Sequence, residues 1–337
     1  MAVQQVRAQD TYVSMLMPEG HGYPLWLPDL PNNLPREYTP RGIRIGDLGY
    51  FDRAGEFVYL FNVCKGANHR INRNRTPPDF VPLIGIPEDN ERGRPDRYMG
   101  NTKIYAVSQE QKSVGADVSV KASIGSATLG ANIEFEFSCS STQAAFLVLP
   151  KGGTSYQSEY PVKFENHALT YGVSWYNYAS NQGRDIPNKM LYLVTGCVKC
   201  SCWGNASYSH STESRKTSLR LSAAEFSSGG LHYNWEVDTE HPVYSRSHPG
   251  PPSNDRHNEG PPSTRENQTV FLSGYAITVQ SRLSLTGKKL VAKTDLIDTS
   301  SSEPPQAGPS KPSHTGTASG TAQVSPVFLF AGLNVQL

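Results

Sequence analysis

The sequence lacks long hydrophobic runs and carries little net charge. No apolar stretch reaches the ~18 residues expected of a membrane-spanning helix, and the formal net charge is +1 over 337 residues. So small a charge excludes strong electrostatic steering of the whole chain toward nucleic acid or an anionic surface, and such binding would need a local basic patch. The N-terminal segment lacks the apolar core of a secretory signal peptide. We therefore expect a cytoplasmic protein.

Cysteines are few, and they do not have the spacing of a metal site. The five cysteines are an odd number, which does not fit a disulfide framework. Cys197, Cys200 and Cys202 form a C-x-x-C-x-C run, but zinc needs four ligands and no second pair exists. We expect reduced structural cysteines and no cofactor or metal, with metal binding and redox sensing as the alternatives.

The common catalytic motifs are also missing. The sequence has no H-E-x-x-H, no G-x-S-x-G and no glycine-rich phosphate loop. Asp47, Asp52 and Glu56 are a candidate for acid–base catalysis by paired carboxylates. Asp52 and Glu56 flank a predicted turn, where acidic residues are ordinary. We therefore predict that the protein is not an enzyme.

Residues that favour strands and turns are abundant, with 29 Gly, 25 Pro and 17 Tyr. We predict one β-rich α+β domain over residues 1–297, built on a central twisted antiparallel sheet with long hairpins. A Pro-, Ser- and His-rich loop over 239–266 is expected to be flexible. Residues 298–323 read as a disordered linker, and 324–337 form a short apolar tail.

Other segments give weaker signals. Residues 1–42 are Pro-rich and are expected to be irregular, and residues 65–100 to form a polar loop. Residues 154–189 hold either a short helix or an aromatic-rich loop, in which Tyr171, Trp175, Tyr176 and Tyr178 form a candidate platform. The run 43–64 predicts a strand pair with a turn at Asp52-Arg53-Ala54-Gly55.

Residues 113–137, "SVGADVSVKASIGSATLGANIEFEF", alternate between apolar and polar positions through two arms. Each arm is close to the ~9–11 residues with which a tilted strand crosses a bilayer. A half-buried hairpin in a soluble sandwich alternates in the same way. The apolar face is rich in alanine, although a static core favours larger side chains. The candidate membrane-facing residues here are Val114, Ala116, Val118, Val120, Ile124, Leu129, Ile133 and Phe135.

Residues 189–226 predict another long strand pair, with a second hairpin over 191–211. Its first arm contains the apolar residues Leu191, Leu193 and Val194. This hairpin is less clear than the first, because its first arm is partly apolar on both faces and its return arm is polar. It does not indicate a membrane strand by itself.

The densest basic cluster is "KGANHRINRNR", with Lys65, Arg70, Arg73 and Arg75 as candidate lipid-binding residues. Each Lys or Arg near an anionic membrane surface is worth about 1 kcal/mol. The alternatives are a solvated loop and a nucleic-acid site. No nucleic-acid-binding module is recognisable, so we expect no nucleic-acid partner.

Several of these stretches resemble gasdermin pore-forming domains. "LYLVTGCVKC" (191–200) is similar to the strand that opens the second gasdermin hairpin, and 113–137 followed by "AAFLVL" is similar to the first hairpin and its following strand. "NQTVFLSGYAITVQ" (267–280) takes the place of the late strand that closes the sheet. The N-terminal "GYPLWLPDLP" and "IGDLGYFDRAGEFVYLFNVC" resemble proteins of mushroom-forming fungi, and the amphipathic first helix of animal gasdermins is missing.

The resemblance implies a pore-former with a cell-death or defence role, held inactive until a protease removes its tail. It implies acidic lipids and copies of the chain itself as partners, and movement from the cytoplasm to a membrane on activation. The candidate inhibitory residues are Val327, Phe328, Leu329 and Phe330, although this segment could also be a last strand reached by a long loop. The alternative function is a non-enzymatic β-sandwich module that binds glycans or protein partners.

Overall fold

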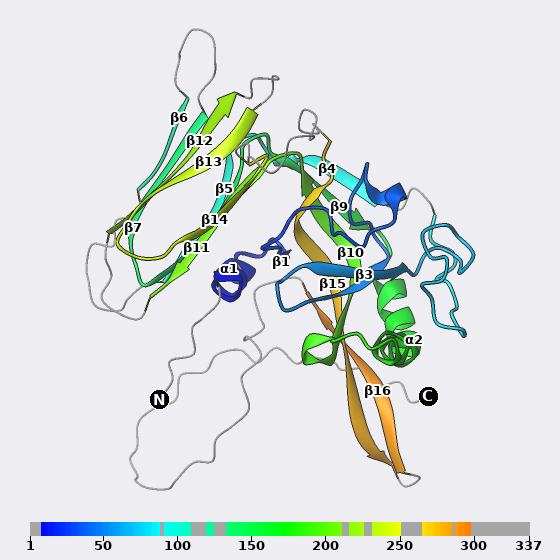
Figure 1. The fold of residues 1–337 in the computed structure, drawn as a ribbon. Helices are drawn as coiled ribbons and strands as arrows, with labels where there is room; N and C mark the ends of the chain where they lie inside the picture. The colour runs from blue at the N-terminus through cyan, green and yellow to red at the C-terminus, as the bar shows by residue number, and fades with distance from the viewer. Residues whose placement is uncertain are drawn as a thin grey trace, which may run out of the picture.

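Three antiparallel sheets organise the described part of the chain (Figure 1). The computed structural model describes residues 8–87, 91–108, 119–124, 133–210, 216–225, 231–250, 265–284 and 287–297. The predicted fold class is confirmed, because the protein is a β-rich α+β fold with antiparallel sheets. The predicted linker and tail, 298–323 and 324–337, lie outside the described residues.

The largest sheet, sheet A, is built around two long strands. β15 (Gln268–Ser284) pairs antiparallel with β10 (Met190–Cys200) along most of β10. β10 contributes side chains to three different apolar clusters, which means that it is buried on both faces. The other members are β1 (Tyr23–Pro24), β2 (Asp47–Phe51), β3 (Phe57–Asn62), β4 (Glu91–Tyr98), β9 (Gly153–Ser158) and β16 (Gly287–Leu296).

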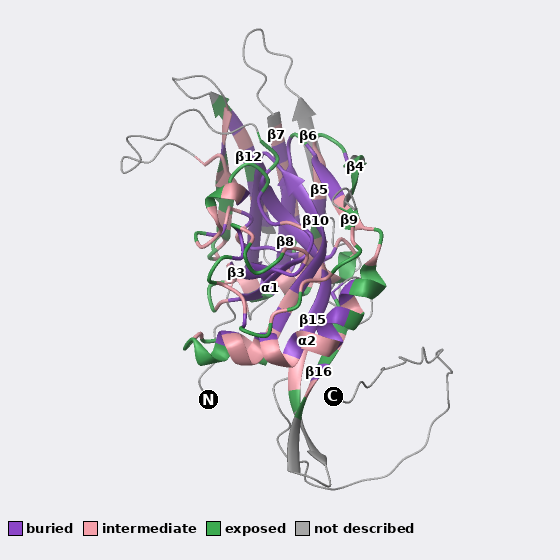
Figure 2. Ribbon diagram, turned by 90° about the vertical axis from the view of Figure 1, so that its right-hand side faces the viewer, coloured by how far each residue is buried: buried purple, intermediate pink, exposed green. Residues whose placement is uncertain are grey.

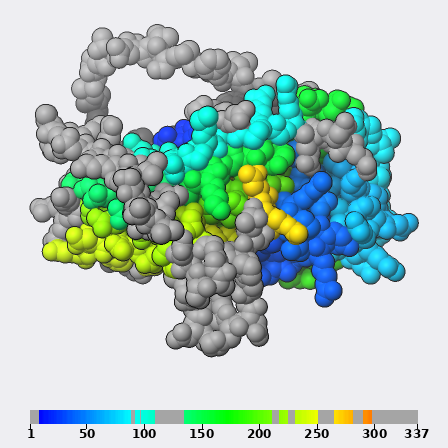
Figure 3. Space-filling view, turned by 90° about the horizontal axis from the view of Figure 1, so that it is seen from above, coloured from blue at the N-terminus to red at the C-terminus, as the bar shows by residue number. Residues whose placement is uncertain are grey.

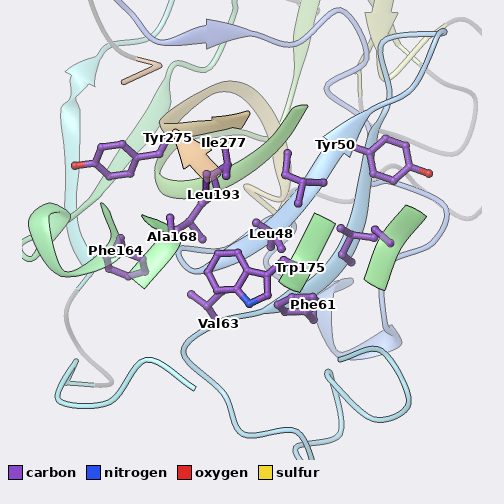
Figure 4. Close-up of a cluster of buried hydrophobic side chains, with 14 of the residues drawn as sticks. Leu48, Tyr50, Phe61, Val63, Phe164, Ala168, Trp175, Leu193, Tyr275 and Ile277 are labelled. Atoms are coloured by element: carbon purple, nitrogen blue, oxygen red, sulfur yellow. The ribbon is translucent and has the colours of Figure 1, made fainter. Parts of the chain in front are cut away.

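Helix α2 (Pro161–Asn181) lies against sheet A and buries Phe164, Ala168 and Trp175 (Figure 4). These side chains meet Leu193 of β10 and other apolar side chains of the sheet in one cluster. The helix approaches the sheet closely at Gly172, where a Cβ atom would lie 2.9 Å from Cγ2 of Ile277. The segment expected to hold a short helix or an aromatic loop is therefore a long helix, anchored by its aromatic face.

Sheets B and C pack face to face as a separate sandwich beside sheet A (Figure 1). Their shared core consists of alternate side chains from both layers, among them Phe137 of sheet C and Phe146 of sheet B, whose ring centroids are 4.8 Å apart. Sheet B contains β5 (Thr102–Val107), β8 (Gln143–Leu149), β11 (Trp203–Ser209) and β14 (Tyr244–His248). Sheet C contains β6 (Ser119–Ile124), β7 (Ile133–Ser140), β12 (Lys216–Glu225) and β13 (Leu231–Asp238).

Helix α1 (Ala8–Leu16) covers the other face of sheet B, where Tyr12 and Leu16 join a cluster with Leu147. The hydroxyl of Ser207 donates to the carbonyl oxygen of Ala8 at 2.8 Å, which fixes the start of this helix. Farther along the N-terminal segment, β1 pairs with β15, and Figure 3 shows blue residues of this segment beside gold residues of the 265–284 range. The expectation that 1–42 is irregular is therefore wrong over α1.

Two predicted loops contain strands. β4 lies within 65–100 and pairs with β9, and β14 lies within 239–266 and pairs with β11. Both strands carry Pro, Ser or charged residues that typically indicate loops, and tertiary pairing overrides that preference. Figure 2 shows that buried residues concentrate in the middle of the sheets, while loops and helix surfaces are exposed.

Candidate functional site

Sheet C consists of two hairpins that lie side by side. β6 pairs antiparallel with β7, and β12 pairs antiparallel with β13. The hairpins meet where β7 pairs with β12, in a register that opposes Phe137 to Leu219 and Phe135 to Leu221. The predicted hairpin over 113–137 is therefore present in its described part, where Ile124 pairs with Ile133.

β7 has one apolar and one polar face, as its sequence predicts. Phe135 and Phe137 are fully buried in the sandwich core, whereas Glu134 and Glu136 are only half-buried. Val120 and Ile124 lie in β6 and Ile133 opens β7. The other candidates of this hairpin, Val114, Ala116, Val118 and Leu129, lie outside the described residues.

The β12–β13 hairpin repeats this arrangement and was missed in the sequence. Leu219, Leu221 and Tyr233 face the core, while Arg220 on the opposite face lies 3.9 Å from Glu134 and 3.8 Å from Glu236. Sheet C therefore has an apolar face against sheet B and a charged face toward solvent. The signal lies in Ser218 to Ala223, where polar and apolar residues alternate, but these residues are predicted only as part of the strand pair over 189–226.

The predicted hairpin over 191–211 is wrong. β10 belongs to sheet A, where Leu191 and Leu193 pack under α2 and Val194 packs in a neighbouring cluster. β11 belongs to sheet B and pairs with β8 and β14. The chain thus passes from one sheet to another between Cys200 and Trp203 and does not turn back on itself. A central strand is buried on both faces and therefore carries apolar residues on both. This explains why β10 shows no clear alternation in the sequence.

Sheets B and C have the same strand order. The order is β14-β11-β8-β5 in sheet B and β13-β12-β7-β6 in sheet C. Along the chain, β5 precedes β6, β7 precedes β8, β11 precedes β12 and β13 precedes β14. Each strand of sheet C is therefore next in chain order to the strand of the same rank in sheet B. The sandwich is in effect one four-stranded sheet folded back on itself.

Polar side chains gather at the bend between the two layers, which we call the fold line: Ser108, the segment 141–142, His210 and the segment 239–243. The hydroxyls of Ser108 and Thr142 lie 3.2 Å apart, and the backbone N–H of His210 donates to the carbonyl oxygen of Thr142 at 3.0 Å. The rings of His210 and His241 stack with centroids 4.0 Å apart. Hydrogen bonds and ring stacking thus hold the bend.

The basic cluster lies in a loop that follows β3. Arg70 and Arg73 are exposed, and Lys65 and Arg75 are partly buried. Partial burial lowers the pKa of His69, and the nearby charges of Lys65, Arg70 and Arg44 lower it further. Three cations therefore lie near His69, and Glu37, 3.9 Å from Arg70, is the opposing charge. Arg44 belongs to this group although it lies outside the basic motif, and only the fold reveals it.

A buried asparagine holds this loop in place. Asn72 accepts a hydrogen bond from the backbone N–H of Asn62 at 2.8 Å and donates to the carbonyl oxygens of Asn62 and Lys65 at 2.8 and 2.7 Å. Asn72 and the β3 residue Asn62 are both buried. Because unpaired buried polar groups are costly, the basic loop is fixed to the end of β3. Sequence reasoning gave no role to Asn72, since nothing in the motif separates it from its exposed neighbours.

Asp47 lies under the same loop and is fully buried. Its carboxylate accepts hydrogen bonds from Tyr38, from the side chain of Asn62 at 2.8 Å and from the backbone N–H of Arg44 at 2.7 Å. Burial raises the pKa of Asp47 to about 7, although these donors act in the opposite direction. The three donors give Asp47 a structural role in positioning Arg44 and β3. Asp52, in contrast, accepts bonds from Ala54 and Glu56 within its own turn.

The three candidate cysteines are all buried, and they lie in different clusters. Cys197 packs in the cluster that contains Val194. Cys200 packs in the cluster covered by α1. Cys202 packs in the core between sheets B and C. Burial raises the pKa of the Cys202 thiol and raises that of Cys200 well above its usual range. Among the described residues, no group of three or more His, Cys, Asp or Glu is placed to hold a metal ion.

Trp175, the largest member of the predicted aromatic platform, is 1% exposed in the cluster under α2. Tyr171, Tyr176 and Tyr178 are partly buried and pack against that cluster. The expected exposed platform on this helix is therefore wrong. Val327, Phe328, Leu329 and Phe330 of the tail lie outside the described residues.

Neither described helix combines the length and the apolar character needed to cross a bilayer. Comparison with protein-family models finds none that matches the chain, and comparison with the curated proteins finds no match either.

Proposed function

We propose that the protein permeabilises acidic membranes by forming pores, with sheet C as the part that enters the bilayer. The observation that carries the proposal is the shared strand order of sheets B and C. Sheet C can swing away from sheet B about the fold line without exchanging any strand partner. A cell-death or defence role follows from the gasdermin resemblance and belongs to the same proposal.

The length and chemistry of sheet C support this role. β12 is 10 residues long and β7 and β13 are 8 residues each, close to the ~9–11 residues of a membrane-crossing strand. Once turned to lipid, the apolar face with Phe135, Leu219 and Leu221 would replace its contacts with sheet B by contacts with acyl chains. The opposite face, with Arg220 and its carboxylate partners, would face water.

The energetics indicate why opening needs a membrane. Burying a large apolar side chain is worth about 1.5–3 kcal/mol, and the sandwich core contains Phe135, Phe137, Phe146, Leu219, Leu221 and Tyr233 among others. Exposing these side chains to water would cost about as much as the ~5–15 kcal/mol that stabilises a whole domain. Lipid removes most of this cost because it is itself apolar.

The basic loop supplies the first contact in this proposal. The cations around His69 would meet acidic headgroups and bring the sandwich close to the membrane. A protease would first remove the apolar tail by cutting within 298–323, after which copies of the chain assemble on the membrane. The protein in this proposal moves from the cytoplasm to the membrane and performs no catalysis.

Dye release from lipid vesicles tests the proposal. The full chain and a chain that ends at Asp298 are each added to vesicles with and without acidic lipid. We expect the shortened chain to release dye from acidic vesicles, and the full chain to release much less until it is cut in the linker. No release from acidic vesicles by the shortened, folded chain would contradict the proposal.

A further inference from the structure

Exposed apolar side chains gather where three segments meet at the start of α2. Of the nine large apolar side chains that are exposed in the described part of the chain, four lie there. They are Val81, Ile84, Val162 and Leu296, and they are 43%, 81%, 63% and 57% exposed. We call these four side chains the α2 patch.

The first segment is the loop 76–87, which continues the chain after the basic loop. Its inward side chains pack against the core under α2 and are Phe80, Leu83 and Ile86. Val81 and Ile84 alternate with them along the loop and are the side chains left exposed. The loop therefore has an anchored side and an apolar outer side.

The second segment is the first turn of α2. Nζ of Lys163 donates a hydrogen bond to the carbonyl oxygen of Gly85 at 2.8 Å. Ile84 precedes Gly85 and Val162 precedes Lys163 in the chain, so this bond brings the two exposed side chains to the same part of the surface. The loop and the helix therefore contribute to one apolar area.

The third segment is the end of β16, which runs beside α2 (Figure 1). A Cβ atom at Gly172 of α2 would lie 3.1 Å from Cβ of Ala292. Two residues farther along β16, the hydroxyl of Thr294 donates to Oε1 of Glu165 at 3.2 Å. The strand thus advances toward the start of the helix, and Leu296 is the next residue on the same face.

Leu296 is also on the helix side of the sheet. It lies directly opposite Tyr275 of β15, and residues directly opposite each other in an antiparallel pair share a face. Tyr275 belongs to the cluster under α2. The described chain ends one residue later, at Ile297, whose backbone N–H donates to the carbonyl oxygen of Gly274 at 2.7 Å. The chain therefore leaves the described body at the border of the α2 patch.

The charges beside the patch balance each other. α2 contributes Lys163 and Glu165, and β16 contributes Lys293 and Asp295. Nζ of Lys293 lies 2.8 Å from Oδ1 of Asp295. Two cations and two anions give no net attraction to acidic headgroups, so the patch fits an uncharged apolar segment better than an acidic membrane surface.

The chain carries such a segment close by. The tail 324–337, "VSPVFLFAGLNVQL", contains no Asp, Glu, Lys or Arg. A Gly- and Ser-rich linker of the length of 298–323 spans roughly 30 Å on average, and the chain already starts from the border of the patch. Tethering by a short flexible linker corresponds to an effective concentration of the order of mM, so even a weak contact is mostly formed.

We propose that the tail 324–337 docks on the α2 patch of its own chain and covers Val81, Ile84, Val162 and Leu296. The inference names the place of the inhibitory tail in the proposed function, and it rests on that function only for the consequence that cutting the linker uncovers the patch. The docking itself takes place in solution and needs no lipid, which allows the two ideas to be tested apart.

Cross-linking within the full chain tests the docking. Ile84→Cys is combined with Leu329→Cys, and the matched control combines Met99→Cys with Leu329→Cys, since Met99 is 71% exposed and lies outside the patch. Both variants are checked for folding by circular dichroism and treated at low protein concentration with a short bis-maleimide. The unsubstituted protein reports any reaction of the native thiols, and mass spectrometry identifies the linked peptides.

The expected result is a link between positions 84 and 329 within single chains, formed severalfold faster than the link between 99 and 329. Equal rates for the two pairs would show that the tail is not held at the patch and would overturn the proposal. Links between positions 84 and 329 of different chains, in place of links within one chain, would also overturn it, because the occupant would then be a second copy.

A charge placed in the patch gives a further control of the contact. We expect Val162→Glu, added to the pair with cysteines at 84 and 329, to slow the link severalfold, because a carboxylate disfavours an apolar contact. Leu290→Glu, at an exposed position on β16 before the part that packs on α2, should leave the rate unchanged. Equal slowing by both substitutions would contradict docking at the patch.

Hydrogen exchange gives a measurement without cysteines. The full chain is compared with the chain that ends at Asp298, and peptides over 76–87 and 161–164 are followed by mass spectrometry. We expect severalfold faster exchange in these peptides of the shortened chain and no change over β4. The same exchange in both chains would contradict the docking.

The outcomes separate this inference from the proposed function. A link between positions 84 and 329 together with no dye release by any form of the chain would leave the docking standing and contradict the proposed function. Dye release by the shortened chain together with no such link would contradict the docking and leave the proposed function standing.

Discussion

Gly204 of β11 and Leu221 of β12 pack against each other across sheets B and C. A Cβ atom at Gly204 would lie 2.7 Å from Cδ2 of Leu221 and 3.3 Å from the indole nitrogen of Trp235. Real Cβ atoms do not come so close to other heavy atoms, so a side chain at position 204 would force Leu221 or the facing layer to shift. The layers are thus packed tightly across the bend that the proposed function opens.

We predict that Gly204→Ala destabilises the folded protein by about 1–3 kcal/mol, because the added methyl group forces the two layers apart. Chemical denaturation monitored by tryptophan fluorescence measures the change. Gly183→Ala would not be a fair control, since Gly183 has φ +74°, whereas Gly66 has no neighbour within 4 Å of its ideal Cβ. We expect Gly66→Ala to be close to neutral. Equal effects at both positions would contradict the tight packing inferred at Gly204.

The buried carboxyl of Asp47 predicts a pH dependence of stability. Its pKa is raised to about 7 in the folded protein, against about 3.9 in an unfolded chain. Between these values the unfolded chain has lost the proton and the folded protein keeps it. Stability contributed by this group is therefore present below pH ~4 and falls by up to about 1.4 kcal/mol per pH unit as the pH rises toward 7.

Denaturation at several pH values, on the protein and on Asp47→Asn, measures this effect. The amide cannot ionise, so the variant should lose this part of the slope between pH 5 and 7. It should also be less stable at every pH, because its NH2 group cannot accept the hydrogen bond from the Arg44 backbone. The same slope in both proteins would show that Asp47 keeps an ordinary pKa.

Asn72 should matter far more than an exposed asparagine of the same loop. We expect Asn72→Ala to cost about 2–4 kcal/mol, because it leaves the backbone N–H and carbonyl of Asn62 without partners in a buried site. Asn68→Ala is the matched control, since Asn68 is exposed. Thermal unfolding compares the two. Limited trypsin digestion adds a second readout, and only Asn72→Ala should speed cleavage after Arg70 and Arg73.

The basic loop predicts a charge-dependent membrane contact. Replacing Arg70 and Arg73 by Ala removes two exposed cations, each worth about 1 kcal/mol at an acidic surface. We expect roughly 30-fold weaker binding to acidic vesicles in a flotation assay and little change on neutral vesicles. Arg92 and Arg94 of β4 are also exposed, and the matching pair of substitutions there should change binding much less. Equal losses from both pairs would mean that the loop has no special role.

The sequence predicts where strands lie better than it predicts which strands pair with each other. The alternation of β7 was readable because one of its faces is buried and the other meets solvent, which is a local property. The partner of β10 was not readable, because a strand buried on both faces shows no alternation that points to a neighbour. The β12–β13 hairpin is not predicted because 216–225 falls within the strand pair predicted over 189–226, and no strand is predicted over Leu231–Asp238.

The same difference between local and tertiary properties separates the residues of the candidate sites. Arg70 and Arg73 could be named from their motif, because exposed charges depend little on the fold. Arg44 and Asn72 could not, and Asp47 is predicted only as a candidate catalytic carboxyl, because their roles come from segments that only the tertiary structure brings together. The closeness of Gly204 to Leu221 and the shared strand order of sheets B and C are likewise properties of topology.

A disulfide between the two layers tests the central claim most directly. Gly204→Cys and Leu221→Cys together place two thiols opposite each other across sheets B and C, and the disulfide is verified by mass spectrometry. In the shortened chain that ends at Asp298, we predict that the oxidised protein binds acidic vesicles and releases no dye, and that a reductant restores release. Undiminished release by the oxidised protein would contradict the opening of sheet C from sheet B.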